Sequence, residues 1–336
     1  MNWNNGFSAR YYITIVDPAS WRDTETFDIV SGTVSKTTDN LMESADVVVT
    51  DLPANGEVWI RIWLDARQGA SGDHVPIFTG LFQAPVTQWD GYRDKYNGAC
   101  YSVLKPADDI LLPRGWYALA GLNGAELAAQ LLEGIAPVSY AKNAPALQTT
   151  IIAEDSETRL SMAQRIMKAI GWRIRIDGYG NIAIVPQADK PSVRFDPEEN
   201  DVVEKSITDE RDWYACPNVF RATSGDQTAT ARDDSRTSPL STVSRGREIW
   251  KEDGSAVLGD GEGIAEYAMR RLAEEQAPAR KIKYARRFQP DIVPGDMVSL
   301  HYMAQNIDGN FKITRQQITL GFGARTQEEV ENDSNE

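Results

Sequence analysis

The alternation of apolar and polar residues predicts short strands in the first hundred residues. In the clearest case, four aliphatic residues between Val58 and Leu64 alternate with Trp59, Arg61 and Trp63. A period of two places the aliphatic side chains on one face of a strand and the other three on the opposite face. Similar runs recur between turn residues up to about residue 105. Many short strands joined by turns are typical of a β-barrel or β-sandwich.

The strand face with Trp59, Arg61 and Trp63 is unusual for a surface that meets water. Tryptophan and arginine are enriched at the centres of protein interfaces. We therefore expect this face to be buried against another domain or another subunit. The alternative is a strand that is covered on both sides within a single sandwich.

The pattern changes to a helical period near Pro106. Apolar residues spaced by three and four predict helices over 123–135 and 156–170. Asn123 and Glu126 form a capping-box pattern at the first helix start. A hairpin follows over 172–185, with its turn at 177–181. These elements predict a small α+β domain over residues 106–200.

From Val202 onward the pattern is again that of strands, with one helix over 262–277 that we expect Pro278 to end. The last eleven residues carry five acidic residues and no basic one, which predicts a tail that is disordered or holds a partner. The fold class is therefore β-rich α+β. We expect β domains over 1–105 and 201–325, the α+β domain between them, and an acidic tail over 326–336.

Charge and hydropathy exclude several classes of protein. The 336 residues carry a net charge of −14, and the segments 1–105, 106–200 and 201–336 carry −5, −3 and −6. No segment has the clustered basic residues that hold nucleic-acid phosphates, so the chain should repel DNA. No run approaches 18 apolar residues, and Met1 to Arg10 lacks a signal-peptide core. We expect no membrane span and assembly in the cytoplasm.

A local exception to this acidity lies near the C-terminus, where five cations fall within eight residues. They are Arg280, Lys281, Lys283, Arg286 and Arg287, interleaved with apolar residues at about strand period. This pattern predicts a strand with one apolar face and one cationic face. The cations are either solvated and salt-bridged or in contact with an acidic neighbouring subunit. With Trp59, Arg61 and Trp63, we take Lys281, Lys283 and Arg287 as candidate interface residues.

Candidate catalytic or metal-binding residues are few. Cys100, Cys216, His74 and His301 lack the paired spacing of a zinc site, and we expect both cysteines to be buried thiols. The Gly-x-Gly triplets at 178–180 and 321–323 do not open a helix as a nucleotide-binding motif would.

Several carboxylate pairs also occur, among them Asp108 with Asp109 and Asp233 with Asp234, and a pair across a cleft could hydrolyse a glycosidic bond. Acid pairs in turns are more often surface residues. We expect no enzyme activity, no cofactor and no metal.

The order of several segments resembles a known family. These segments are Leu41 to Pro53, Phe78-Thr-Gly80, the helix and hairpin from Leu160 to Val185, Cys216 to Ser224, and Gln289-Pro-Asp-Ile-Val-Pro-Gly-Asp-Met-Val-Ser-Leu300 after the strand Arg280 to Tyr284. Together they cover about residues 10–325. The sequence is similar to phage tail baseplate hub proteins, a tube-like family shared with contractile injection systems.

The resemblance implies a structural virion protein at the distal end of a phage tail. Such hubs are homotrimers with two tube-like β domains per chain, and their ring adapts the sixfold tail tube to the threefold tip. The implied partners are the other two copies of the chain in a homotrimer, a tail tube or distal tail protein, and a tip, spike or tape-measure protein. DNA would pass through the lumen without specific binding. A hub of a bacteriocin or secretion apparatus is the first alternative, and a cell-wall hydrolase with a carboxylate pair is the second.

Overall fold

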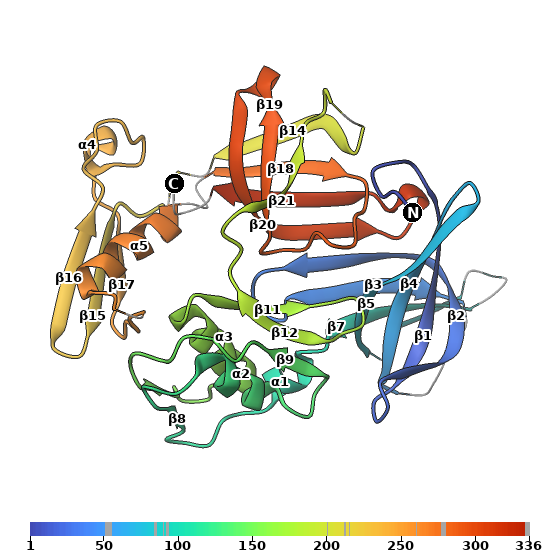
Figure 1. Cartoon of the computed structure of the whole chain (residues 1–336), viewed down its shortest axis with the longest axis horizontal. Helices are drawn as coiled ribbons and strands as arrows, with labels where there is room; N and C mark the ends of the chain where they lie inside the picture. Colours follow the sequence, from blue (N-terminus) through green and yellow to red (C-terminus); the bar gives the residue numbers. More distant parts are fainter. Residues whose placement is uncertain are drawn as a thin grey trace.

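The chain is described by a computed structural model over residues 1–50, 56–83, 86–89, 91, 94–199, 201–211, 213–214, 216–259, 261–276 and 280–332. Figure 1 shows C-terminal strands above N-terminal strands, a helical region below them, and a smaller region that projects to one side. The expected β-rich character is confirmed. Within these residues, no helix is both long enough and apolar enough to cross a membrane.

Six antiparallel strands of the N-terminal region pair in an order that returns to its start. The order is β1, β4, β5, β7, β3 and β2, and β2 also pairs with β1. A further strand, β6, pairs with β7. Alternate residues such as Ile60, Leu64 and Phe78 are fully buried in the core that these strands share. The strands are β1 (Ser8–Asp17), β2 (Arg22–Thr37), β3 (Glu43–Val49), β4 (Val58–Gln68), β5 (Ser71–Phe82), β6 (Val86–Trp89) and β7 (Asp94–Ser102).

The C-terminal strands extend the same sheet. The end of β2, from Thr33 to Thr37, pairs antiparallel with Arg315 to Thr319 of β20, and the order continues through β21, β18 and β14. On the other part of β20, β19 pairs with β20 and with β13. A separate apolar core fills this region. The strands are β13 (Pro191–Phe195), β14 (Val203–Arg211), β18 (Arg280–Arg286), β19 (Met297–Tyr302), β20 (Ile307–Thr319) and β21 (Thr326–Asn332).

The middle region contains the two helices and the hairpin that the sequence predicts. Asn123 Oδ1 accepts a hydrogen bond from the Glu126 amide, and Thr158 Oγ1 accepts one from the Ser161 amide, so side chains cap both main helices. The apolar faces of these helices share one core with the hairpin. The elements are α1 (Lys105–Asp109), β8 (Tyr117–Ala118), α2 (Gly124–Leu132), β9 (Val138–Tyr140), β10 (Ile151–Ile152), α3 (Arg159–Ala169), β11 (Trp172–Ile176) and β12 (Ile182–Pro186).

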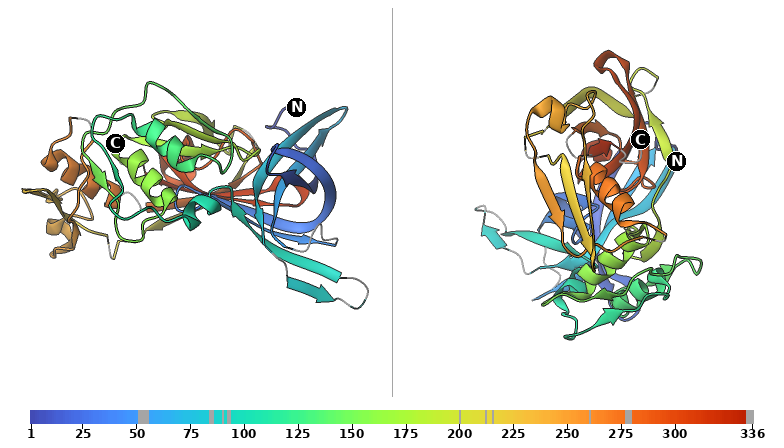
Figure 2. Two further views of the ribbon diagram at one scale, coloured as in Figure 1. Left: turned by 90° about the horizontal axis from the view of Figure 1, so that it is seen from below. Right: turned by 90° about the vertical axis from the view of Figure 1, so that its left-hand side faces the viewer.

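An outer region lies within the stretch that we expected to form a single β domain. Its three strands pair only with each other in the described part of the chain, and helix α5 packs on them over a small core. Figure 2 shows this region at the end of the molecule opposite the N-terminal strands. Its elements are β15 (Val219–Ser224), β16 (Gln227–Arg232), α4 (Thr242–Arg245), β17 (Trp250–Asp253) and α5 (Ile264–Gln276). Pro278 lies outside the described residues.

The acidic C-terminal segment does not form a disordered tail over residues 326–332. These residues form β21, between β20 and β18 in the sheet. The expectation is wrong because the acidic residues face cations on β18 and because Val330 is fully buried. The last four residues of the predicted tail, 333–336, lie outside the described residues.

Candidate interface site

Strand β4 presents Arg61 to the turn that joins β11 to β12 in the middle region. Arg61 is only 2% exposed. Its Nη1 donates to Asp23 Oδ1 at 2.7 Å, and its Nε donates to Thr79 Oγ1 at 2.9 Å. Its Nη2 donates to the carbonyl oxygen of Tyr179 at 3.1 Å. Because a guanidinium holds its donors in one rigid plane, Arg61 joins two strands of the N-terminal region to the middle region.

The two tryptophans beside Arg61 are covered by parts of the same chain, Trp63 almost fully and Trp59 in part. Trp63 is 8% exposed, and its Nε1 donates to Thr14 Oγ1 at 3.1 Å. The Tyr179 ring meets it edge-on, with ring centroids 5.7 Å apart. Trp59 packs against the core of the middle region and lies 5.6 Å from the Trp21 ring. This face of β4 therefore meets another region of its own chain. A role between subunits for these residues stays a prediction.

The β11–β12 turn approaches strand β5 closely because two of its residues are glycines. A Cβ atom on Gly178 would lie 1.8 Å from the carbonyl oxygen of Pro76. Gly180 has a φ of +78°, a conformation that favours glycine. Thr79 Oγ1 donates to the carbonyl oxygen of Gly178 at 2.8 Å. The Gly-x-Gly triplet at 178–180 therefore allows the middle region to pack closely against the N-terminal region.

The strand side of the same hairpin contacts the C-terminal region. Arg173 Nη2 lies 2.5 Å from Asp296 Oδ1, and its Nη1 donates to the carbonyl oxygen of Pro294 at 3.3 Å. Both side chains of the ion pair are close to nine-tenths buried. A Cβ atom on Gly295 would lie 2.2 Å from Arg173 Nη1, and Gly295 has a φ of +88°. The β11–β12 hairpin thus contacts the N-terminal region at its tip and the C-terminal region along its side.

The predicted cationic face of β18 is a salt-bridged strand face. Lys281 Nζ lies 3.4 Å from Glu329 Oε1, and Lys283 pairs with Glu210 on the neighbouring strand. The hydrogen bond with Glu210 raises the pKa of Lys283. Both lysines keep more than a third of their side-chain surface exposed. Their contact with an acidic neighbouring subunit stays a prediction.

Two adjacent arginines at the end of β18 face opposite sides of the sheet. Arg287 lies 3.1 Å from Asp201 near the surface. Arg286 is 1% exposed and lies 2.6 Å from Glu328, which is also buried. Our placement of Arg286 on the cationic face is wrong. Arg286 is two residues from Tyr284 and therefore lies on the same face of the strand, where the Tyr284 side chain points into the core.

Glu328 is the centre of a buried hydrogen-bond network in the C-terminal region. Its Oε1 accepts from Arg286 Nη2 at 2.6 Å and from Gln316 Nε2 at 2.9 Å. Its Oε2 accepts from the Tyr284 hydroxyl. Burial raises the pKa of Tyr284. This carboxylate is therefore compensated inside the core, as a buried charge must be.

The candidate catalytic groups have structural partners. Asp233 Oδ2 accepts from Ser238 Oγ at 2.6 Å, and Asp108 and Asp109 both pair with Lys105. Burial raises the pKa of the Cys100 thiol, which makes it a poor nucleophile at neutral pH. Among the residues that the structure covers, no group of three or more His, Cys, Asp and Glu side chains is placed to hold a metal ion.

The fold of the chain is similar to that of two phage tail proteins. No family model and no curated protein matches the sequence. The tail protein from Neisseria meningitidis MC58 has a TM-score of 0.71 with this chain, covers 97% of both chains and is 14% identical. The 43 kDa tail protein of prophage MuSo2 from Shewanella oneidensis has a TM-score of 0.70, covers 96% of this chain and 98% of its own, and is 12% identical.

A type VI secretion component from Escherichia coli is also similar. It has a TM-score of 0.53 and 9% identity, and the match covers 90% of this chain and 73% of that one. That protein is described as structurally similar to the bacteriophage T4 tail proteins gp27 and gp5. At these identities the likeness concerns the fold. At that level, the resemblance to baseplate hub proteins is confirmed.

Several residues of this junction had no sequence signal. Asp23 and Thr79 lie 38 and 18 positions from Arg61 along the chain, and only the pairing of strands brings them to it. Arg173 and its partner Asp296 are 123 positions apart, and no local pattern connects them. In the sequence, the glycines at 178 and 180 indicate a turn. This turn is the only local pattern that points to the contact between the hairpin and β5.

Proposed function

We propose that the chain is a structural protein of a phage tail, namely a baseplate hub that assembles as a trimeric ring. Strands β1–β7 and the C-terminal strands β13, β14 and β18–β21 would form its two tube-like domains, with the region from α1 to β12 between them and the outer region from β15 to α5 inserted in the second. The observation that carries this proposal is the antiparallel pairing of β2 with β20, which joins two β-rich regions into one sheet within a chain that has a tail-protein fold. Three such chains supply the six β units that would match a sixfold tube.

Open sheet edges offer a way for neighbouring chains to join. Within the described residues, β13 and β14 each pair with one strand only. An unpaired edge is a template for a strand of another chain. Pairing of such edges between copies would repeat the kind of contact that β2 and β20 make within one copy. Lys281, Lys283 and Arg287 lie on or next to β18, beside β14, and are our candidates for contact with an acidic neighbour.

The charge of the chain suits a channel through which DNA passes. A net charge of −14 repels phosphates, so DNA would slide along such a wall without being held. The proposal assigns no catalytic step to this chain. The acid pairs discussed above support this assignment, since they hold turns and helix ends.

The native mass of the purified chain, with negative-stain images of the same sample, tests the proposal. A trimer has three times the 37.3 kDa chain mass, about 112 kDa, and should show a ring with a central hole. If the chain is a monomer, a tail tube protein from the same source is added and the measurement is repeated. A monomer that forms no ring in either sample contradicts the hub proposal.

A second candidate is the hub of a secretion or bacteriocin apparatus. The similarity to a type VI secretion component favours it. Capsid and terminase genes beside the coding sequence would support the phage assignment, and their absence together with sheath and effector genes would support the second. Turnover of purified cell wall by the isolated chain would instead support the hydrolase alternative.

A further inference from the structure

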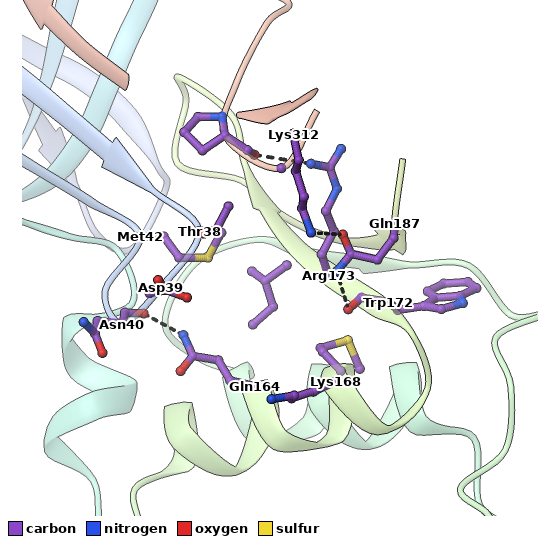
Figure 3. Close-up of a pocket in the computed structure, with 14 residues that line it drawn as sticks. Thr38, Asp39, Asn40, Met42, Gln164, Lys168, Trp172, Arg173, Gln187 and Lys312 are labelled. Carbon is purple, nitrogen blue, oxygen red and sulfur yellow. Dashed lines mark hydrogen bonds between the residues drawn. The ribbon is translucent and has the colours of Figure 1, made fainter. Parts of the chain in front are cut away.

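A pocket opens where the N-terminal, middle and C-terminal regions meet (Figure 3). Its walls are the turn between β2 and β3, helix α3, strand β11, the loop that contains Pro294 and the middle of β20. The cavity measures about 520 Å³, which lies within the range of ligand pockets, roughly 300–1,000 Å³. An occupant of this pocket would touch all three regions at once.

The pocket combines an apolar surface with amide groups. Met42, Met167 and Ile174 supply apolar atoms from three different elements. Gln164 and Gln187 lie on opposite sides, as Figure 3 shows. Methionine side chains adapt to irregular partners. A short peptide, which has both apolar and hydrogen-bonding groups, suits such a surface better than a wholly polar molecule does.

Two lysines bring positive charge to opposite walls of the pocket. Lys168 comes from the last turn of α3 and Lys312 from β20, and Figure 3 shows them on either side of the opening. The third cation, Arg173, is paired with Asp296, and Lys312 Nζ donates a hydrogen bond to Gln187 Oε1 at 3.3 Å. Asp39 is the acidic residue of the lining and lies on the β2–β3 turn, away from Lys168. In a chain with a net charge of −14, this is a local concentration of cations.

Lys168 lacks a counter-ion in the described part of the chain, where its ammonium group makes no hydrogen bond and no ion pair. The pKa of Lys168 is lowered by the partial burial of its ammonium group, whose side chain otherwise lies at the surface, and by the nearby Arg271, while Glu274 and Glu275 act in the opposite direction. The arginines on the neighbouring helix do have counter-ions. Arg270 and Arg271 are both paired with carboxylates of α5. A ligand carboxylate would supply the charge that Lys168 lacks.

We infer that this pocket binds an acidic peptide segment of a neighbouring protein, with carboxylates on Lys168 and Lys312 and an apolar side chain between them. A peptide carboxylate fits better than inorganic phosphate because the carbon chain that carries it can contact Met42, Met167 and Ile174. The site follows from the geometry of this chain alone. The identity of the neighbour as another tail protein rests on the proposed function.

Isothermal titration calorimetry of the full chain tests the inference with two capped tripeptides. The probe is glutamyl-leucyl-glutamate, and its matched control is glutaminyl-leucyl-glutamine. We expect the acidic peptide to bind at least tenfold more tightly than the amide peptide. Lys168→Met should remove this preference, and Lys312→Gln should reduce it. Lys142→Met is the control variant, because Lys142 is exposed in the same region but does not line the pocket.

Three results would overturn the inference. They are equal affinity for the two peptides, including no binding of either at millimolar concentration, an unchanged preference in Lys168→Met, and competition by inorganic phosphate as strong as that of the acidic peptide. Circular dichroism of each variant shows that it is folded, and the exposed position of Lys168 makes loss of folding unexpected. Since ring formation is measured separately, failure of this site and failure of the hub proposal are distinguishable.

Discussion

Two groups of charged residues in this molecule look alike in sequence and differ in the structure. Arg61 and Arg286 are almost wholly buried, and each has several fixed partners. Lys281 and Lys283 on the outer face of β18 pair with carboxylates at a half-exposed surface. The first group joins regions or fills a core, whereas water can replace the partners of the second group.

The difference teaches that burial, and not the number of ion pairs, decides what a charge contributes. Removal of one partner from a buried pair leaves the other charge without water or counter-ion. An exposed pair loses little, since its members are solvated in either state. The following variants test this comparison, from the largest expected effect to the smallest.

The largest effect is expected from Arg286→Met. This change leaves Glu328 buried without its cation and should lower the free energy of unfolding by about 3–5 kcal/mol. Chemical denaturation followed by circular dichroism measures it. The double variant Arg286→Met with Glu328→Gln removes both charges and should regain a large part of the loss. A single variant as stable as the parent would contradict the assignment of this pair as a buried network.

Arg61→Met should cost less, because Asp23 remains partly exposed to water. The change removes the donors to Asp23, Thr79 and the Tyr179 carbonyl. A hydrogen bond to a charged group contributes about 1.5–3 kcal/mol. We expect the free energy of unfolding to fall by an amount in that range. Limited proteolysis should cut the variant faster near the β11–β12 turn. Arg61→Lys keeps the charge without the planar donors and should recover only part of the stability.

Gly178→Ala tests the close approach of the hairpin to β5. The added methyl group would overlap the Pro76 carbonyl, so the turn must shift, with an expected loss of about 1–3 kcal/mol in the free energy of unfolding. Gly254→Ala is the matched control, because a Cβ atom there meets nothing within 4 Å. Thermal unfolding of the two variants side by side measures the difference. Equal melting temperatures would show that the hairpin does not depend on this contact.

Lys283→Met should leave the melting temperature of the isolated chain unchanged, because the lysine and its partner Glu210 are about half exposed. If Lys283 contacts a neighbouring subunit, the same variant should weaken the ring. Native mass and thermal unfolding of one sample separate these effects. A large drop in the melting temperature of the monomer would show that this exposed ion pair contributes as much as a buried one.

The smallest expected effect is a dependence on pH from Glu204. Its hydrogen bond with Arg325, at 2.6 Å, lowers the pKa of Glu204 below its ordinary value of 4.5. The stabilisation is therefore present above about pH 4.5 and is lost as the pH falls through the lowered pKa of the folded state. Glu204→Gln should lose this component of the acid response. Denaturation curves of both proteins between pH 3 and 6 compare them.

Local patterns were sufficient for most elements of the fold. The strand around Val58 to Leu64, the two capped helices of the middle region and helix α5 are confirmed near their predicted positions. Each depends on a repeat of apolar residues that a few neighbouring positions define. Local composition gives no sign that the acidic segment after residue 325 is a strand, because its partners on β18 are 40 or more positions away.

The sequence by itself determined a β-rich chain with a helical middle, an acidic surface and an aromatic face on β4 that required cover. Only the tertiary structure decided what covers that face, where Arg286 and Glu328 go, and which walls form the pocket around Lys168. The reason is that the alternation of apolar and polar side chains is set by residues close together in the chain. The burial and pairing of charges depend on strands that are far apart in the sequence and pair only in the folded protein. Because of this tertiary arrangement, the β11–β12 hairpin contacts both the N-terminal and the C-terminal β-rich regions.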